Sequence, residues 1–309
     1  MSVMYAQQNP TKISHMPVNV DEMWKASHGC KVNRSAKLQR FTDEIQLEVG
    51  STAVVTKAYD HLLQRKVALK RMKVDHTMHH EIREYRMGKA IGVHPNVATM
   101  YENVYTSADE ACLVMECADG GNLVDMLANR NKGLGIDGFK IIARQLAAGV
   151  SHMHKKGIAH RDIKSDNISL SSDTCNFKLL DFGESQFASE YVDILKCGTL
   201  AYISPELISE IERYNSQYNT RGLDFDLLAA DVWSLGITFY SICTAQIPFT
   251  CASVRDSGFR NYLRDDIMGS KRTWRSVDRY LQTLLIHMCD PEPTTRWTMS
   301  EVVEYLDTL

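Results

Sequence analysis

Beyond residue 40, apolar and polar residues alternate in short runs. The strict alternation of Ile45–Val49 predicts a half-buried strand. Further strands are predicted at 54–59, 66–71, 97–105 and 111–116, with a polar turn at 60–65. The apolar residues of His80–Ile91 are spaced as in a helix, and this segment ends before Gly92 and Pro95. We therefore expect a sheet of about five strands with one helix in this part of the chain.

The periodicity becomes helical beyond Gly120 and Gly121. Helices are predicted at 123–128, 139–155, 230–245, 280–289 and 300–309. A strand-rich part followed by a helix-rich part predicts an α+β fold of two packed lobes with a cleft between them. Residues 1–40 lack such periodicity and are expected to be a partly disordered extension, in which the segment around Trp24 is a candidate for docking on the main body.

Composition and charge narrow the classes of function. The 309 residues are 44% hydrophobic and 24% charged, which is ordinary for a globular protein. A net charge of −3 gives no indication of nucleic-acid binding or of a basic membrane surface. The eight cysteines form no C-x-x-C pair and no secretory leader is evident, which favours a cytoplasmic or nuclear protein with reduced thiols. No run of about 18 apolar residues is present, so no membrane span is predicted.

The strongest chemical signal is the run His160-Arg161-Asp162-Ile163-Lys164-Ser165-Asp166-Asn167. It is followed by Asp181-Phe182-Gly183, which the apolar pair Leu179-Leu180 precedes. Either segment alone is compatible with a surface loop that uses Asp and Asn as capping residues. Together and in this order they match the catalytic loop and the metal-binding D-F-G triplet of eukaryotic protein kinases. The chain resembles this family, in its serine/threonine type, from Phe41 to Leu309.

The resemblance implies a bilobal protein kinase fold with an N-lobe at 41–116, a hinge at 117–122 and a C-lobe at 123–309. It also implies ATP and Mg2+ as cofactors and proteins with Ser or Thr acceptors as substrates. Phosphoryl transfer depends mainly on positioning and on charge neutralisation. By resemblance, Asn167 and Asp181 bind magnesium. Asp162 orients the acceptor hydroxyl and takes its proton, and Lys164 neutralises the γ-phosphate.

A second motif, Val67-Ala68-Leu69-Lys70, resembles the third strand of a kinase N-lobe. The resemblance implies that Lys70 contacts the α- and β-phosphates and pairs with a glutamate on the following helix. Glu81 and Glu84 are both candidates, and the distance to His94-Pro95 favours Glu84. Gly88 stands where many kinases have an apolar side chain, so we expect this helix to be held less firmly.

The expected adenine and phosphate contacts come from several segments. Of the usual glycines of the phosphate loop only Gly50 is kept, and Glu48 and Ala53 stand at the positions of the other two. In the adenine floor, Ser169 replaces a leucine-like residue. Both changes predict weaker ATP binding. The residues expected at the nucleotide are Gly50, Val55, Ala68, Lys70, Met115 as gatekeeper, Glu116, Cys117 and Ser169.

The resemblance also implies three contacts in the C-lobe. Thr199 is expected to touch Asp162 and Lys164 at the acceptor site. Glu206 is expected to pair with Arg296, and Asp231 to brace the backbone of the catalytic loop.

No Ser or Thr precedes Cys197 closely, although Arg161 is of the type that a loop phosphate usually neutralises. We expect Glu190 or Asp193 to take the place of that phosphate.

The finer classification is less specific. The run 195–202 and the segment around Trp274 resemble the calcium/calmodulin-dependent group, checkpoint kinases in particular. Asn122 replaces a glutamate that recognises arginine in basophilic kinases, and Asp166 remains, so a weakened preference for basic substrates is expected. The alternatives are a pseudokinase that binds nucleotide or acts as a scaffold, and a small-molecule or lipid kinase. The sequence leaves the oligomeric state open, with a monomer as the expectation.

Overall fold

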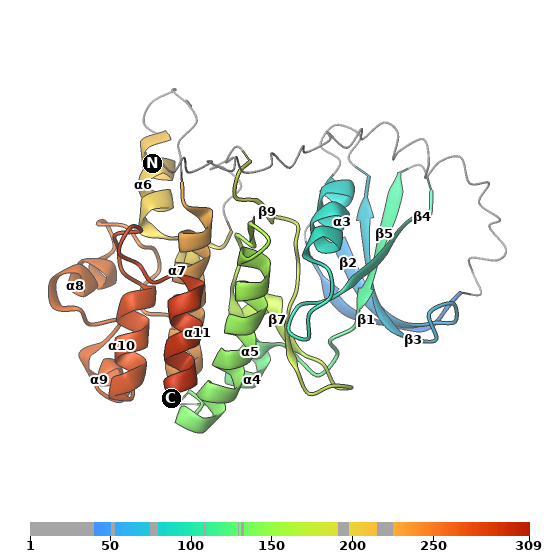
Figure 1. Ribbon diagram of the computed structural model, residues 1–309. Coiled ribbons are helices and arrows are strands. Elements are labelled where there is room, and N and C mark those ends of the chain that lie inside the picture. Colours follow the sequence, from blue (N-terminus) through green and yellow to red (C-terminus); the bar gives the residue numbers. More distant parts are fainter. Residues whose placement is uncertain are drawn as a thin grey trace, which may run out of the picture.

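A five-stranded antiparallel sheet forms the smaller lobe in the computed structural model (Figure 1). The structure describes residues 40–50, 53–74, 80–107, 109–128, 130, 133–190, 198–214 and 225–309. The strand order is β1-β2-β3-β5-β4, and each strand pairs with neighbours that run in the opposite direction. The strands are β1 (Phe41–Val49), β2 (Ala53–Asp60), β3 (Arg65–Lys73), β4 (Met100–Tyr105) and β5 (Glu110–Glu116).

The register of the sheet places the expected nucleotide residues on one face. Val55 lies opposite Lys70 in the β2–β3 pair, and Ala68 lies opposite Met115 in the β3–β5 pair. Directly opposed residues of an antiparallel pair point to the same side, and so do residues two apart on one strand. These side chains therefore share the side of the sheet from which Lys70 reaches the cleft.

Strand β1 differs from the half-buried strand that its alternation predicts. Ile45, Leu47 and Val49 are 55%, 44% and 63% exposed. Among the residues that the structure describes, β1 is the edge strand of the sheet and pairs only with β2. The alternation of apolar and polar residues determines which side chains of β1 share a face. It does not determine whether other described residues pack on that face.

The helix α3 (His80–Ile91) has the bounds that the sequence predicts, and it packs on β4 and β5 (Figure 1). Its Gly88 allows an unusually close approach to β4, because a Cβ added there would lie 2.6 Å from the Cβ of Met100. Met100, which is 2% exposed, thus fills the space next to Gly88. The expectation of a loosely held helix is wrong: its missing side chain is replaced by a methionine from the sheet.

The predicted strand at 97–105 begins only at Met100. The residues before it pair with the C-lobe instead: Ala98 N–H donates to the Leu179 carbonyl over 2.9 Å, and Leu179 N–H donates to the Asn96 carbonyl over 3.0 Å. This pairing ties the segment after α3 to the strands beneath the hinge. One hydrophobic cluster accordingly runs through both lobes.

The larger lobe is mainly helical, with α7 at its centre (Figure 1). By length and hydropathy α7 could cross a bilayer, but 89% of its apolar window is buried inside the protein, as in a core helix. The helices α5 and α10 pack against α7, and α11 packs against α5. The helices are α4 (Leu123–Ala128), α5 (Ile136–His154), α6 (Pro205–Tyr214), α7 (Leu227–Thr244), α8 (Ser257–Asp265), α9 (Lys271–Trp274), α10 (Arg279–Met288) and α11 (Met299–Thr308).

Short elements between the lobes carry the catalytic loop. Their strands form the pairs β6–β9 and β7–β8. The periodicity of the sequence predicts none of them, because each contains only two or three residues. They are β6 (Ile158–Ala159), the 3-10 turn η1 (Ser165–Asn167), β7 (Ile168–Leu170), β8 (Phe177–Leu179), β9 (Gln186–Phe187) and the 3-10 turn η2 (Leu200–Tyr202).

Candidate active site

Lys70 joins the two lobes through a pair of carboxylates. Its ammonium lies 2.8 and 2.9 Å from the carboxylate oxygens of Glu84 on α3, and 2.9 Å from Oδ1 of Asp181. Of the two candidate glutamates, Glu84 is therefore the partner of Lys70, as the spacing to His94-Pro95 indicates. A sheet residue, a helix residue and a C-lobe loop residue meet at one nitrogen atom.

The charges at this junction shift each other's pKa values. Burial alone would lower the pKa of Lys70, but Glu84 and Asp181 outweigh burial and raise it. Burial raises the pKa of Asp181, but the Lys70 ammonium, the Gly183 N–H and His160 together outweigh burial, so the pKa of Asp181 is lowered overall. For Glu84, burial is the largest effect and raises its pKa. Lys70 and Asp181 are consequently both charged at neutral pH.

Asp181 has the exposure and the backbone conformation of a functional group. Its side chain is 46% exposed and its φ is 60°, in the left-handed region that costs a non-glycine residue energy. Oδ1 accepts the N–H of Gly183 over 3.2 Å. Next to it, Phe182 is buried and its ring meets the ring of His160 edge to face at 6.0 Å. The buried neighbour fixes the loop, and the carboxylate is left facing the cleft.

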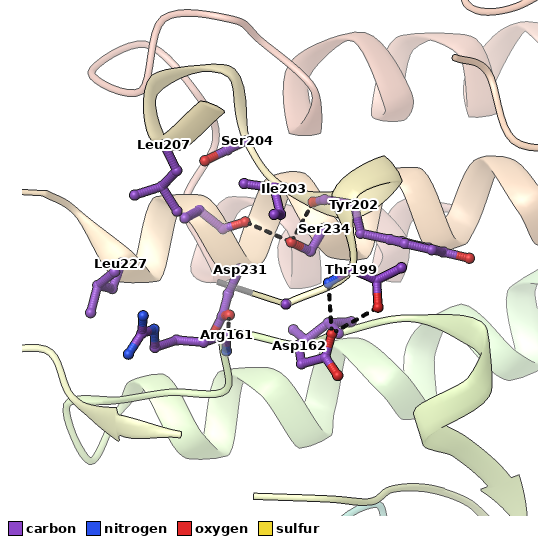
Figure 2. A pocket seen from close by; sticks show the side chains of 13 residues that line it. Arg161, Asp162, Thr199, Tyr202, Ile203, Ser204, Leu207, Leu227, Asp231 and Ser234 are labelled. Carbon is purple, nitrogen blue, oxygen red and sulfur yellow. Dashed lines mark hydrogen bonds between the residues drawn. The ribbon is translucent and has the colours of Figure 1, made fainter. Parts of the chain in front are cut away.

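A second cluster surrounds the carboxylate of Asp162, which Figure 2 shows next to Thr199. The Lys164 ammonium lies 2.8 Å from Oδ2, and the amide of Asn167 donates to the same oxygen over 2.9 Å. Thr199 donates to Oδ1 through its N–H over 3.1 Å and through its hydroxyl over 3.3 Å. Lys164 also donates to the Thr199 hydroxyl over 2.7 Å. The contacts expected between Thr199, Asp162 and Lys164 are thus all present.

Asp231 on α7 holds the backbone that carries Asp162. Its carboxylate accepts the N–H of His160 over 2.7 Å, the N–H of Arg161 over 2.8 Å and Nε2 of His154 over 3.0 Å. Arg161 has a φ of 70°, a strained conformation that persists only where its surroundings enforce it. Asp231 supplies this constraint, as the sequence predicts.

The activation segment differs from expectation at Arg161. The Arg161 guanidinium donates to the side-chain carbonyl of Gln186, which in turn donates to the Glu190 backbone carbonyl over 3.4 Å. The Glu190 carboxylate lies instead 3.6 Å from Arg86 on α3, so Glu190 is not the substitute for a phosphate that we expected. Asp193 lies outside the described residues, as do Leu195, Lys196 and Cys197. No motif signalled the role of Gln186, which is a buried amide in a two-residue strand.

The end of the same segment is fixed to the C-lobe. Arg296 donates to both carboxylate oxygens of Glu206, over 2.8 and 2.9 Å, as predicted. It also donates to the carbonyls of Ala229 and Asp290, each over 2.9 Å, and lies over the ring of Trp233. The Arg296 side chain is fully buried, so this is a structural contact rather than part of the chemistry.

An open cleft of about 1,410 Å3 connects the two clusters. Its lining includes Gly50, Lys70, Glu84, Asp162 and Asp181, five of the residues expected at the site. By contrast, the cavity beside Thr199 and Ser204 in Figure 2 measures about 20 Å3, which is room for one water molecule. A nucleotide therefore fits only the larger of these two spaces.

The cleft suits a hard divalent cation that a phosphate chain also binds. Asn167 and Asp181 offer oxygen ligands, and within the described ranges no group of three or more His, Cys, Asp and Glu side chains is placed to hold a metal. Magnesium is usually bound by one or two carboxylates together with substrate phosphates and water. The donor set therefore fits magnesium.

The adenine side is formed as expected in part. Val55, Ala68 and Met115 share the side of the sheet from which Lys70 reaches the cleft, and Ser169 is buried on β7 under the hinge, where it forms a β-bridge with Asn122. The N–H of Glu116 donates to the Thr99 carbonyl over 2.9 Å, so this donor is not available to adenine. Cys117 follows directly as the next hinge residue.

The phosphate loop departs further from its expected role. The N–H of Gly50 donates to the Ala53 carbonyl over 2.9 Å, which closes the turn between β1 and β2. Gly50 lines the cleft, but its N–H is already used by the Ala53 carbonyl. Residues 51 and 52 lie outside the described ranges. In this phosphate loop, which lacks the usual glycines, the Gly50 amide therefore stabilises the turn between β1 and β2.

The paired lysine, the two carboxylates and the order of the lobes define a class of protein. The chain belongs to the protein kinase family: a model described as "Protein kinase domain" matches residues 41–306. It is 30% identical to CBL-interacting serine/threonine-protein kinase 17 of Arabidopsis thaliana over 82% of this chain. It is 32% identical to CBL-interacting protein kinase 20 of Oryza sativa over 72% of this chain.

A calcium and calcium/calmodulin-dependent serine/threonine-protein kinase of Oryza sativa is 28% identical over 71% of this chain. These names agree with the calcium/calmodulin-dependent group that the sequence resembles. The matches cover 56%, 46% and 40% of the respective relatives, so the chain spans about half of their length. None of these three relatives bears the name of a checkpoint kinase.

Proposed function

We propose that this protein is an ATP-dependent protein kinase that transfers the γ-phosphoryl group to serine and threonine hydroxyls. The observation that carries the proposal is the contact of Lys70 with both Glu84 and Asp181, in one cleft with Asp162. Glu84 and Asp181 position the Lys70 ammonium to bind anionic phosphates, and the Asp181 carboxylate is exposed in the same cleft. The serine/threonine type is supported by Lys164 and Thr199, and by the names of the relatives.

In this mechanism the protein supplies position and charge. Lys70 binds the phosphate chain of ATP, and Glu84 keeps its ammonium directed into the cleft. Asn167 and Asp181 would hold Mg2+, which when bound neutralises phosphate charge. Asp162 orients the acceptor hydroxyl and takes its proton, and such a general base contributes about 10²–10⁴-fold to rate. Lys164 neutralises charge on the transferred group, and Thr199 keeps Asp162 and Lys164 in place.

The reaction does not require a phosphorylated activation loop in this proposal. Gln186 provides Arg161 with a neutral hydrogen-bond partner, and it also contacts the activation segment at Glu190. Ser185 is fully buried and donates to the His160 carbonyl over 3.2 Å, so a phosphate there would disrupt the catalytic loop. Phosphatase treatment should leave the activity unchanged. A large loss of activity after treatment, with a phosphate mapped to Ser189 or Tyr191, would contradict this.

Substrates with upstream arginine should be only weakly preferred. Asn122 occupies the glutamate position of basophilic kinases, and its side-chain oxygen accepts the N–H of Asp125 over 2.7 Å at the start of α4. Asp166 is exposed on η1 and remains as a single acidic contact. The names of the relatives give no support to a role in checkpoint or DNA-damage signalling, so the proposal is limited to the reaction.

A positional peptide library with serine, threonine or tyrosine acceptors tests this function. We expect phosphate on serine and threonine peptides, and an Asp162→Asn variant that still binds ATP but transfers at most about 1% as fast. Equal activity of the two proteins would indicate a contaminating kinase. ATP binding without transfer would favour a pseudokinase, and phosphate on small molecules or lipids alone would favour another kinase class.

A further inference from the structure

The carboxylate of Asp119, in the hinge, contacts both lobes. From the N-lobe, the ammonium of Lys57 on β2 lies 3.3 Å from Oδ2, and that of Lys66 on β3 lies 3.9 Å away. From the C-lobe, the Ser172 hydroxyl, in the turn between β7 and β8, donates to Oδ1. The Asp119 carboxylate thus connects the strands β2 and β3 of the N-lobe with the turn between β7 and β8 of the C-lobe.

The C-lobe side of the hinge is already fixed by its backbone. Gly120 N–H donates to the Leu170 carbonyl over 2.8 Å, and Leu170 N–H donates to the Gly121 carbonyl over 2.9 Å. Between Asp119 and the N-lobe strands β2 and β3, the contacts are the side-chain ones with Lys57 and Lys66. Asp119 is therefore the point at which a well-anchored hinge connects to the roof of the cleft.

Lys57 reaches this carboxylate from the nucleotide side of the sheet. It lies opposite Ala68 in the β2–β3 register and two residues after Val55, so all three side chains share one face. The Lys57 and Asp119 side chains are 30% and 9% exposed, and a pair partly withdrawn from water is screened less than a surface pair.

The outer part of the network should matter less. Lys66 also lies 3.4 Å from Asp173, with side chains that are 50% and 66% exposed. Pairs so exposed contribute little to stability. The charge state of Asp119 follows from its neighbours: the hydrogen bond from Ser172 lowers its pKa most, burial opposes this, and Lys57 and Lys66 lower it further. Asp119 is thus ionised at neutral pH.

We propose that Asp119 is a positioning residue for nucleotide binding, whose contacts with Lys57 and Ser172 set the separation of the lobes at the hinge. This proposal rests on the proposed function, because it concerns how the ATP site is held. The separation of the lobes determines how closely Val55 and Ala68 on the roof approach Ser169 on the floor. Since the Gly50 amide is used in a turn, a site pre-organised at the hinge compensates for a phosphate loop that contributes less.

Direct binding of MgATP by calorimetry on the full chain tests the proposal. We expect Asp119→Asn to raise the Kd for MgATP roughly fivefold, which is within the usual range of coupling between contacting groups. Lys57→Met should have a similar effect, and the double variant should be no weaker than either. Asp119→Glu should recover most of the affinity. Asp173→Asn is the matched control, because it removes a carboxylate of the same network that is far more exposed.

A cycle of the same variants in urea unfolding separates this proposal from the proposed function. If the wild type binds no MgATP, the proposed function fails, and the coupling of Lys57 with Asp119 is then read from the unfolding equilibrium. A coupling of roughly fivefold in that equilibrium supports the contact across the hinge. Coupling indistinguishable from zero overturns the proposal, and so does wild-type affinity for MgATP in Asp119→Asn. Equal weakening by Asp173→Asn also overturns it, because a general charge effect would then suffice.

Discussion

The contact between Gly88 and Met100 predicts that Gly88→Ala impairs catalysis. The added Cβ would lie 2.6 Å from Met100 Cβ, 3.1 Å from its Cγ and 3.2 Å from its Cε. Carbon atoms in contact prefer about 3.5–4.0 Å, so about 1 Å of separation must be created. Rotation of the Met100 side chain cannot move its Cβ, which is fixed to β4. The helix α3 must therefore move away from the sheet.

The expected magnitude comes from two opposing effects. Overpacking of this kind costs about 1–3 kcal/mol. Alanine favours a helix over glycine by about 1 kcal/mol, so the net loss of stability should be only about 0–2 kcal/mol. The functional effect should be larger, because Glu84 is one helical turn from Gly88 and its contact with Lys70 lengthens when α3 moves. A displacement of 1 Å can cost up to about 100-fold in rate, and we expect roughly a tenfold loss in kcat/KM.

Urea unfolding and steady-state kinetics measured on the same preparation check this prediction. Gly138→Ala is the control, because Gly138 also lies in a helix, α5, and the nearest atom to its added Cβ would be the Leu134 Cβ at 3.2 Å, which leaves 0.6 Å more room than the 2.6 Å at Gly88. The control should gain or keep stability with unchanged kinetics. A further Met100→Gly change in the Gly88→Ala protein should restore part of the activity. Full activity of Gly88→Ala, with stability raised as in the control, would refute the reasoning.

Three further predictions concern stability and specificity. Arg296→Met should destabilise the protein by about 3–5 kcal/mol in urea unfolding, since Glu206 loses its buried partner; a loss below about 1 kcal/mol would show that the pair is dispensable. Burial raises the pKa of Asp60, but the hydrogen bonds from Arg40 and from two backbone N–H groups outweigh burial and lower this pKa overall. Asp60 therefore stabilises the fold above its unfolded pKa of about 3.9, and this stabilisation is lost as the pH falls through its lower folded pKa. Asp60→Asn should hence cost about 1–2 kcal/mol at pH 6 and less near pH 3, and a pH-independent cost would contradict this. Asn122→Glu should increase the preference for upstream arginine in a peptide array, and an unchanged profile would argue against the assigned subsite.

Residues with obligatory chemistry could be predicted from the sequence, because their spacing reflects what the reaction needs. The choice of Glu84 over Glu81, the contacts of Thr199 and the pair of Glu206 with Arg296 all follow from motifs. The bounds of α3 and α4 follow from apolar periodicity. Segments of two or three residues, such as β6 and β9, are too short for any periodicity, and α8 lies in polar sequence without a motif.

Contacts between distant segments could not be predicted from residue types alone. Gly88 indicated a missing side chain, but not that Met100 would occupy its place. Gln186 has no charge to mark it as the partner of Arg161. Asp119 is an acidic residue of the loop between β5 and α4, and its importance depends on Lys57, which reaches it from another strand. In each case the deciding information is a tertiary distance.

The proposed function requires that Lys70, Asp162 and Asp181 act on one phosphate chain. The most direct measurement is transfer of labelled phosphate from γ-labelled ATP to a serine peptide, in wild type and Asp162→Asn purified in parallel, with MgATP affinity determined for both. We expect transfer by the wild type, a loss of transfer of at least about 100-fold in the variant, and similar MgATP affinity in both proteins. Transfer at equal rates, or affinity lost together with transfer, would contradict it.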